Sequence, residues 1–173
     1  MGKTVKNNTL LFRAISYAAR AHRYQLRKDG VTPYVSHVFR VAMTLSQVFG
    51  VTDPEVLTAA VLHDTIEDTT SGFDDLAERF GKKTARWVAL LSKNKCLPEK
   101  EREAAYCRQL ASAPAPVKLI KLADLHDNLL DAATAGPGQK KKSRNNARRY
   151  LKALAHKPHS VLKQPLAIVR RLA

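Results

Sequence analysis

The sequence predicts an all-α protein. Apolar residues recur at helical spacing through most of the chain, no segment shows the alternating pattern of a strand, and Gly, Pro or Asp residues stand between the periodic segments. With 173 residues the chain is long enough for one compact domain with its own core and short for two. We therefore expect a single multi-helix domain over residues 1–173.

The helices can be placed from their periodicity and their end signals. The first apolar pattern begins at Leu10 and continues to about Leu26, with a turn at Gly30. A later helix is expected to begin at Asp53-Pro54, because Asp accepts free backbone N–H groups as a cap and Pro is tolerated at the first helical position. The other helices are expected at residues 36–48, 73–80, 83–92, 98–111 and 117–133.

The last quarter of the chain differs in charge from the rest. All 15 acidic residues lie at or before Asp131, where they face 19 of the 30 Lys and Arg residues, so residues 1–131 carry +4 of the net +15. Residues 134–143 are expected to form a flexible basic connection, followed by basic helices at 144–155 and 159–172. These helices either fold back over the functional site or are solvated basic helices, since charge runs generally mark exposed faces. Such a segment attracts polyanions, either a nucleic acid or a phosphate-rich small molecule.

Several protein classes are not expected from this sequence. No apolar stretch reaches the roughly 18 residues of a spanning helix, and the first residues, "MGKTVKNNTLLF", lack a signal-peptide cleavage pattern. The two cysteines, Cys96 and Cys107, are too few for a disulfide framework and lack metal-ligand spacing. We expect a cytoplasmic protein with no membrane partner.

The stretch "HDTIEDTT" at 63–70 follows the apolar run "VLTAAVL". On one continuous helix His63, Asp64, Glu67 and Asp68 would share a sector of about 140°. Like charges four residues apart repel, and a buried carboxylate without a partner costs several kcal/mol. A divalent metal bound by His63 and Asp64 would resolve this, whereas the structural alternative is a solvated helix end with a hydrogen-bonded core histidine.

Two other segments favour the metal site. "TPYVSHVFRVA" places His37 at the start of an amphipathic helix, and "VKLIKLADLHDNLLDA" places Asp124 in the middle of an apolar helix. Each has a structural alternative, since a lone His at a helix start is usually structural and a lone mid-helix Asp usually has a Lys partner. Together with His63 and Asp64 they make a set of two nitrogen and two oxygen ligands that suits one Mn²⁺ ion, with Mg²⁺ and other divalent cations as alternatives.

These segments resemble a known family. His37, "HDTIEDT" at 63–69 and "KLADLHDN" at 121–128 are similar to the successive motifs of the HD-domain phosphohydrolases. "RKDGVTPYVSH" and "AAVLHDTIEDT" resemble the hydrolase domain of the RelA/SpoT alarmone enzymes more closely, over about residues 9–132. The remaining length has no room for a synthetase domain, so the chain resembles a stand-alone small alarmone hydrolase. That resemblance implies an all-α HD-domain bundle and hydrolysis of the 3′-pyrophosphate of (p)ppGpp, giving GDP or GTP and pyrophosphate.

The resemblance also implies roles for individual residues. It matches four positions to Mn²⁺ ligands, two to an acidic catalytic pair, and others to contacts with the phosphorylated purine nucleotide. The ligands are His37, His63, Asp64 and Asp124; the catalytic pair is Glu67 and Asp68; the substrate contacts are Arg27, Lys28 and Asn128. Arg144 and Tyr150 of the basic tail would meet the 5′ phosphates or the base if the tail folds over the site. Tyr34 is interpreted as a packing residue.

Departures from the family pattern leave other substrates open. Leu125 and Leu130 stand where the family usually has basic residues, which concerns the substrate contacts and leaves the metal ligands unchanged. Adenosine alarmones, or the 2′-phosphate of NADPH, are therefore alternative substrates of the same metal site. A non-enzymatic alternative is a basic nucleic-acid-binding module, which we do not expect because it leaves the acidic cluster unexplained and lacks a recognised binding motif.

Overall fold

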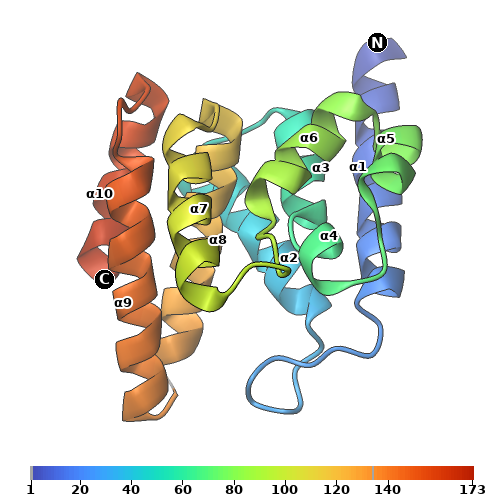
Figure 1. Ribbon diagram of the computed structural model, residues 1–173. Coiled ribbons are helices and arrows are strands. Elements are labelled where there is room, and N and C mark those ends of the chain that lie inside the picture. Colours follow the sequence, from blue (N-terminus) through green and yellow to red (C-terminus); the bar gives the residue numbers. More distant parts are fainter. Residues whose placement is uncertain (1, 134) are drawn as a thin grey trace. The chain divides into compact units, whose positions relative to one another are not determined.

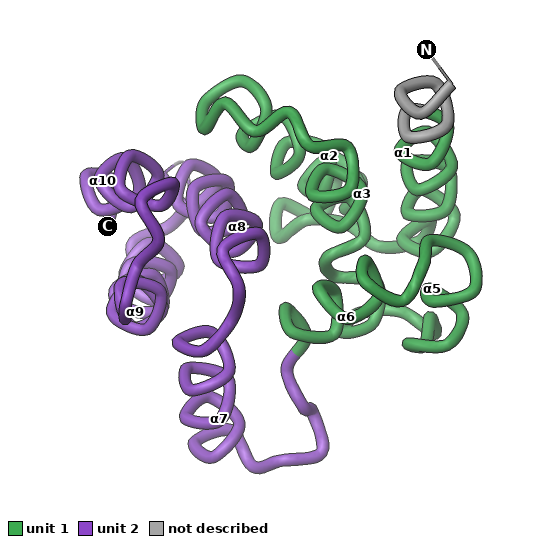
Figure 2. The backbone as a smooth tube through the Cα atoms, turned by 90° about the horizontal axis from the view of Figure 1, so that it is seen from above, with its two compact units in different colours: residues 1–92 green, residues 93–173 purple. Residues whose placement is uncertain are grey.

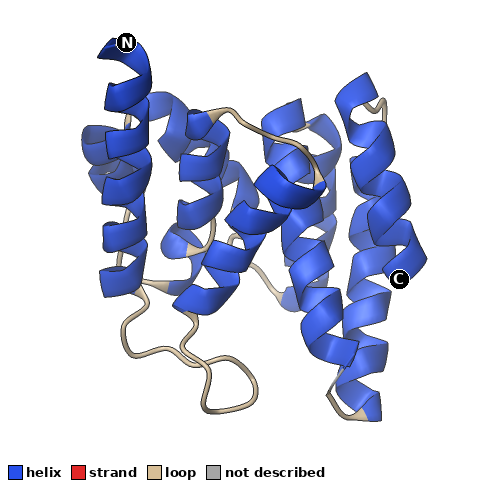
Figure 3. Ribbon diagram, turned by 180° about the vertical axis from the view of Figure 1, so that it is seen from behind, coloured by secondary structure: helices blue, strands red, loops and turns tan. Residues whose placement is uncertain are grey.

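The computed structural model describes residues 2–133 and 135–173, with side chains from Thr9 onward. Every regular element in these residues is a helix (Figures 1 and 3), and the one bridge between extended residues joins Leu26 to Pro33. The predicted all-α fold class is thus confirmed. None of the described helices is long and apolar enough to cross a membrane.

The chain divides into two compact units, residues 1–92 and residues 93–173 (Figure 2). The helices of unit 1 are α1 (Gly2–Ala21), α2 (Val35–Met43), the π-helical turn η1 (Thr44–Val48), α3 (Pro54–Leu62), α4 (Thr65–Asp68), α5 (Phe73–Phe80) and α6 (Lys82–Leu91). Those of unit 2 are α7 (Glu99–Ser112), α8 (Ala115–Ala133), α9 (Pro137–Leu154), the 3-10 turn η2 (Ser160–Leu162) and α10 (Lys163–Leu172).

Helix α3 is the centre of unit 1. It packs against α1, α2 and α6, and its residues from Thr58 to Leu62 are all buried. Beyond Glu55 in its first turn the helix has no charged residue, and such a segment belongs in a core because no face is suited to water. Its start is capped as predicted: Asp53 Oδ1 accepts from the Glu55 N–H at 2.8 Å, and Pro54 is the first helical residue. The core therefore fixes the position of the residues that follow α3.

The helix does not continue through His63 and Asp64, so the prediction that one helix carries the whole "HDTIEDTT" cluster is wrong. The Thr65 hydroxyl donates to the Leu62 carbonyl at 2.7 Å, and His63 Nδ1 lies 2.8 Å from the Ala60 carbonyl. These side chains bond carbonyls near the end of α3, and the chain turns before α4 begins. The polar residues consequently lie on a turn and a short helix. The sector of about 140° calculated for one continuous helix does not describe all four, although the Asp68 N–H still donates to the Asp64 carbonyl at 2.9 Å.

Two other boundaries differ from the sequence prediction. The first helix ends at Ala21, because residues after it form a looped segment closed by the Arg27 N–H to Thr32 carbonyl bond at 2.8 Å. The predicted flexible connection at 134–143 is also wrong from Pro137 onward, where α9 has already begun. Pro at the first helical position is pre-organised for a helix, which the basic composition of the segment obscured. Thr134 lies outside the described residues.

Unit 2 is organised around α8, which packs against α9, α10 and η2. One buried lysine links its helices: Lys118 Nζ donates to the Ala111 carbonyl and to the His156 carbonyl, each at 2.9 Å. The side chain is 4% exposed, and burial lowers the pKa of its ammonium group. Lys118 therefore joins the C-terminal ends of α7 and α9 to the start of α8.

We expect Lys118→Met to lower the free energy of unfolding by about 2 kcal/mol, because the carbonyls of Ala111 and His156 lose a charged donor while the side-chain volume is kept. Urea unfolding followed by circular dichroism measures the change. The control is Lys163→Met, since Lys163 is exposed on α10. Equal unfolding midpoints for the two variants would contradict the structural role of Lys118.

Candidate metal centre

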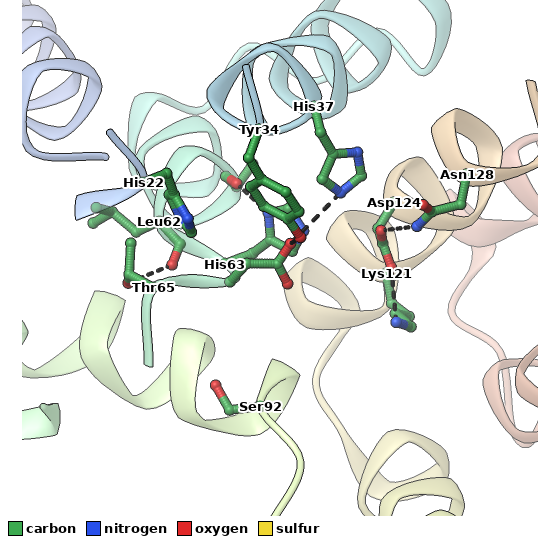
Figure 4. A network of polar contacts seen from close by, with 12 residues as sticks. His22, Tyr34, His37, Leu62, His63, Thr65, Ser92, Lys121, Asp124 and Asn128 are labelled. Atoms are coloured by element: carbon green, nitrogen blue, oxygen red, sulfur yellow. Dashed lines mark hydrogen bonds and ion pairs between the residues drawn. The ribbon is translucent and has the colours of Figure 1, made fainter. Parts of the chain in front are cut away.

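Three predicted ligands converge in unit 1 from separate elements. His37 lies in the first turn of α2, His63 directly follows α3, and Asp64 precedes α4. His37 Nε2 is 3.6 Å and His63 Nε2 is 3.0 Å from Asp64 Oδ2 (Figure 4). One ring nitrogen of His37 lies within 4.8 Å of one of His63. Both imidazoles are buried, at 1% and 2% exposure, and the Asp64 side chain is 18% exposed, so the cluster combines two desolvated imidazoles with a half-buried carboxylate.

The hydrogen bonds of His63 determine which of its ring nitrogens can bind a cation. The Ala60 carbonyl can only accept, so Nδ1, at 2.8 Å, carries the proton that is donated to it. In the neutral ring Nε2 then presents a lone pair to Asp64 Oδ2, which is also an acceptor, at 3.0 Å. Two acceptors at this distance require a cation between or beside them, either a proton or a metal ion.

The surroundings of Asp64 favour the negatively charged form of its side chain. Tyr34 Oη donates to its Oδ2 at 2.6 Å. Burial alone would raise the pKa of the Asp64 carboxyl, but the neighbouring His63 and His37 imidazoles hold that pKa well below its ordinary value. A carboxylate and two imidazoles are ligands that divalent cations use in proteins, and the residues of unit 1 therefore fit a divalent metal site.

Asp124 lies in unit 2, on α8, and is 5% exposed. Its Oδ2 accepts from Lys121 Nζ at 2.7 Å and its Oδ1 from Asn128 Nδ2 at 2.5 Å (Figure 4). Burial would lower the pKa of Lys121, but the Asp124 charge raises it well above its ordinary value. The lysine partner that is usual for a mid-helix Asp is thus present, and both carboxylate oxygens are oriented by donors on the same helix.

A second polar cluster of unit 2 contains Tyr150, which is 3% exposed. Its hydroxyl donates to Glu103, which also accepts from Lys93 Nζ at 2.9 Å. Burial and then this hydrogen bond raise the pKa of the Tyr150 hydroxyl. The Lys121 ammonium group lies 5.0 Å from the Tyr150 ring centroid and 5.3 Å from that of Tyr106. Tyr150 therefore packs against the lysine that holds Asp124.

The predicted catalytic pair, Glu67 and Asp68, lies on the short helix α4, and both side chains are half-buried. Gln25 fixes this helix in place, since its Nε2 donates to the Asp68 carbonyl at 2.5 Å and its Oε1 accepts from His22 Nδ1 at 2.7 Å. The His22 ring, 1% exposed, stacks on Tyr34 with ring centroids 4.9 Å apart. The loop before α2 is thereby connected to both Asp64 and α4.

The predicted substrate contacts of unit 1 lie on the looped segment between α1 and α2. The Arg27 guanidinium is 5.5 Å from the Tyr34 ring centroid, and Lys28 is exposed. Asp29 closes the loop by accepting from the Thr32 hydroxyl and the Thr32 and Val31 N–H groups, hydrogen bonds that lower the pKa of its carboxyl to about 2. Arg144 is exposed on α9 of unit 2.

Sequence reasoning missed the polar partners of the site. Tyr34 does pack, against His22, but its hydroxyl also donates to a predicted ligand. Its position three residues before His37 on the same motif was an available signal. His22 and Gln25 gave none, because they bond each other within a loop and Gln25 bonds a backbone carbonyl 43 positions along the chain.

The helical fold and the His37, His63 and Asp64 cluster define an α-helical domain whose residues fit a divalent metal site. A sequence model described as HD domain matches residues 14–158, so the chain belongs to the HD domain family. The matched residues come from both compact units.

Similar proteins with curated names include hydrolases of guanosine-3′,5′-bis(diphosphate). The human guanosine-3′,5′-bis(diphosphate) 3′-pyrophosphohydrolase MESH1 is 41% identical over 128 residues, which are 73% of this chain and 72% of the human protein. The bifunctional (p)ppGpp synthase/hydrolase SpoT of Escherichia coli is 34% identical over 153 residues, 85% of this chain and 21% of SpoT. A solved structure described as a metazoan ortholog of SpoT that hydrolyzes ppGpp matches with a TM-score of 0.83 and 33% identity, over 94% of each chain.

We expect Tyr34→Phe to weaken divalent metal binding about 10- to 100-fold, because Asp64 loses the donor that orients it. Calorimetric titration of the purified chain with MnCl₂ measures the affinity. Tyr24→Phe is the control, since Tyr24 is 84% exposed. An affinity equal to that of the control would show that the hydroxyl of Tyr34 does not support the site.

Proposed function

We propose that this chain hydrolyses the 3′-pyrophosphate of (p)ppGpp, giving GDP or GTP and pyrophosphate. The observation that carries the proposal is the buried cluster of His37, His63 and Asp64. It occurs in a chain that is 39–42% identical to metazoan proteins named as hydrolases of this substrate. Both free cysteines are consistent with a reducing compartment, and we propose a cytoplasmic location.

We propose one Mn²⁺ ion as the cofactor, held by His37, His63, Asp64 and Asp124. The first three are supported by the geometry of unit 1, and Asp124 by the order of motifs in the sequence. A set of two imidazole nitrogens and two carboxylate oxygens is intermediate between the softer ligands of Zn²⁺ and the oxygen-only ligands of Mg²⁺. The bound ion would lower the pKa of a coordinated water and neutralise charge on the phosphoryl oxygens.

The remaining steps fall to the chain's own side chains. Glu67 or Asp68 on α4 would accept the proton of the attacking water, since both carboxylates are half-buried on the helix that follows Asp64. Tyr34 would keep Asp64 oriented throughout. Arg27 and Lys28 would hold phosphates, because guanidinium and ammonium groups bind phosphoryl oxygens by charge-assisted hydrogen bonds. Asn128, Arg144 and Tyr150 are proposed as further substrate contacts from unit 2.

With Mn²⁺ present, the purified chain should release pyrophosphate from ppGpp, and His63→Ala should abolish both metal retention and hydrolysis. The reason is that His63 is one of two buried imidazoles of the cluster. Metal analysis and a pyrophosphate-release assay give the two results. His156→Ala, at an exposed position, is the control.

Parallel assays with the adenosine alarmone and with NADPH test the substrate. Release of phosphate from NADPH without any release of pyrophosphate from ppGpp would overturn the proposed reaction and retain the metal centre.

Glu67→Gln should lower kcat for ppGpp by about 10²- to 10⁴-fold while the Mn²⁺ content stays at the wild-type level, because the change removes a proton acceptor and no proposed ligand. Asp68→Asn is measured alongside, and the variant with the larger loss identifies the proton acceptor. Glu78→Gln, exposed on α5, controls for the loss of one carboxylate. Wild-type kcat in both α4 variants would exclude this pair from catalysis.

A further inference from the structure

Unit 2 contains a small pocket whose lining is cationic and apolar. It lies among the C-terminal end of α8, the first turns of α9 and the last turn of α10, and its volume is about 180 Å³. Three cationic side chains line it, Lys140, Arg144 and Arg171. Leu129 and Leu172 are among its apolar lining residues.

The three cations have no acidic counterpart in the pocket. No acidic residue lines it, and in residues 2–133 and 135–173 none of the three side chains takes part in an ion pair. Residues 132–173 contain no Asp or Glu at all, and the first turn of α9 has no acidic residue to offset its positive end. Like charges that line one small pocket repel each other, and an anion would remove that repulsion.

The size and lining indicate the chemical class of that anion. Pockets for whole drug-sized molecules usually exceed about 300 Å³, so a volume of about 180 Å³ suits a smaller group. No aromatic residue lines the pocket, which leaves a nucleobase without a stacking partner. Two guanidinium groups, from Arg144 and Arg171, can each bind two oxygens of a phosphoryl group.

We propose that the pocket formed by Lys140, Arg144 and Arg171 binds a phosphate or diphosphate group. The group has two chemically equivalent sources, free inorganic pyrophosphate and the 5′-diphosphate of a nucleotide. Pyrophosphate is a product of the proposed reaction, and the second source rests on the proposed function because it makes the pocket a subsite for substrate.

The test is calorimetric titration of the full-length chain with inorganic pyrophosphate. It is performed in a His63→Ala background, so that the proposed metal centre does not contribute. Arg144→Gln combined with Arg171→Gln should weaken binding about tenfold or more, since two charged hydrogen-bond donors are lost. The matched control combines Arg148→Gln with Arg170→Gln, which removes the same charge from the same two helices at a wider depression of about 410 Å³.

The control pair is expected to bind pyrophosphate within about threefold of the parent chain, because its arginines lie outside the proposed pocket. The pocket is refuted if the Arg144 and Arg171 pair binds as tightly as the parent chain. Equal losses of pyrophosphate affinity in the two double variants would also refute the pocket, since they would indicate attraction by net charge alone.

Kinetics with ppGpp in the otherwise wild-type chain distinguish the two sources. If the pocket takes the nucleotide's 5′-diphosphate, the Arg144 and Arg171 pair raises KM about tenfold with kcat retained, and GDP competes with pyrophosphate. If it takes free pyrophosphate, GDP does not compete and KM is unchanged, a result that would remove Arg144 from the substrate contacts proposed above. Either result supports the pocket. Absence of ppGpp hydrolysis would refute the proposed function and leave the titration as an independent test.

Discussion

The carboxylate of Asp64 lies between two buried imidazoles, and this placement of charge constrains the rest of unit 1. Burying a carboxylate lowers the stability of the fold unless hydrogen-bond donors or a cation compensate its charge. Removing one partner of a buried pair lowers the stability by more than the intact pair contributes. The compensation comes from Tyr34 and His37 at the start of α2 and from His63 at the end of α3. Helix α3, which is buried from Thr58 to Leu62, cannot move without exposing these core residues, so it holds His63 and Asp64 in a fixed position.

Side chains help to end helix α3 at Leu62. The bonds from Thr65 to the Leu62 carbonyl and from His63 to the Ala60 carbonyl satisfy backbone groups that the interrupted helix leaves open. The interruption lies before Asp64, and the Asp68 N–H still donates to the Asp64 carbonyl at 2.9 Å. Asp64 and Asp68 therefore remain one helical turn apart, where their like charges repel unless donors or a cation compensate them.

Much of this could be predicted from the sequence, because the signals are local. The cap of α3 by Asp53 depends on residues adjacent in sequence, and His37 at the start of α2 follows from one amphipathic segment. The interruption after Leu62 could not be predicted, since the apolar pattern reports which residues are buried and not which carbonyls accept from side chains. The start of α9 at Pro137 was missed because the basic, glycine-containing composition of that segment is also typical of a loop.

Side-chain partners were predictable only when they lie within a turn of the same helix. Lys121 and Asp124 are three residues apart on α8, and an Asp in the middle of a helix usually pairs with a Lys. The Tyr34 to Asp64 bond spans 30 positions, and the Tyr150 to Glu103 bond spans 47. Such pairs depend on how helices pack, which apolar periodicity does not specify.

The separation of charge along the chain has a physical reason that connects both candidate sites. A metal centre needs carboxylates, and all the acidic residues lie at or before Asp131. A pocket for phosphoryl groups needs cations that no carboxylate neutralises, and α9 and α10, which follow Asp131, contain no Asp or Glu. An acid on α9 or α10 would pair with Arg144 or Arg171 and occupy the donors that an anion requires. The acid-free composition of α9 and α10 thus leaves the guanidinium groups of Arg144 and Arg171 available for phosphoryl oxygens, while the +15 net charge attracts polyanionic ligands to the protein.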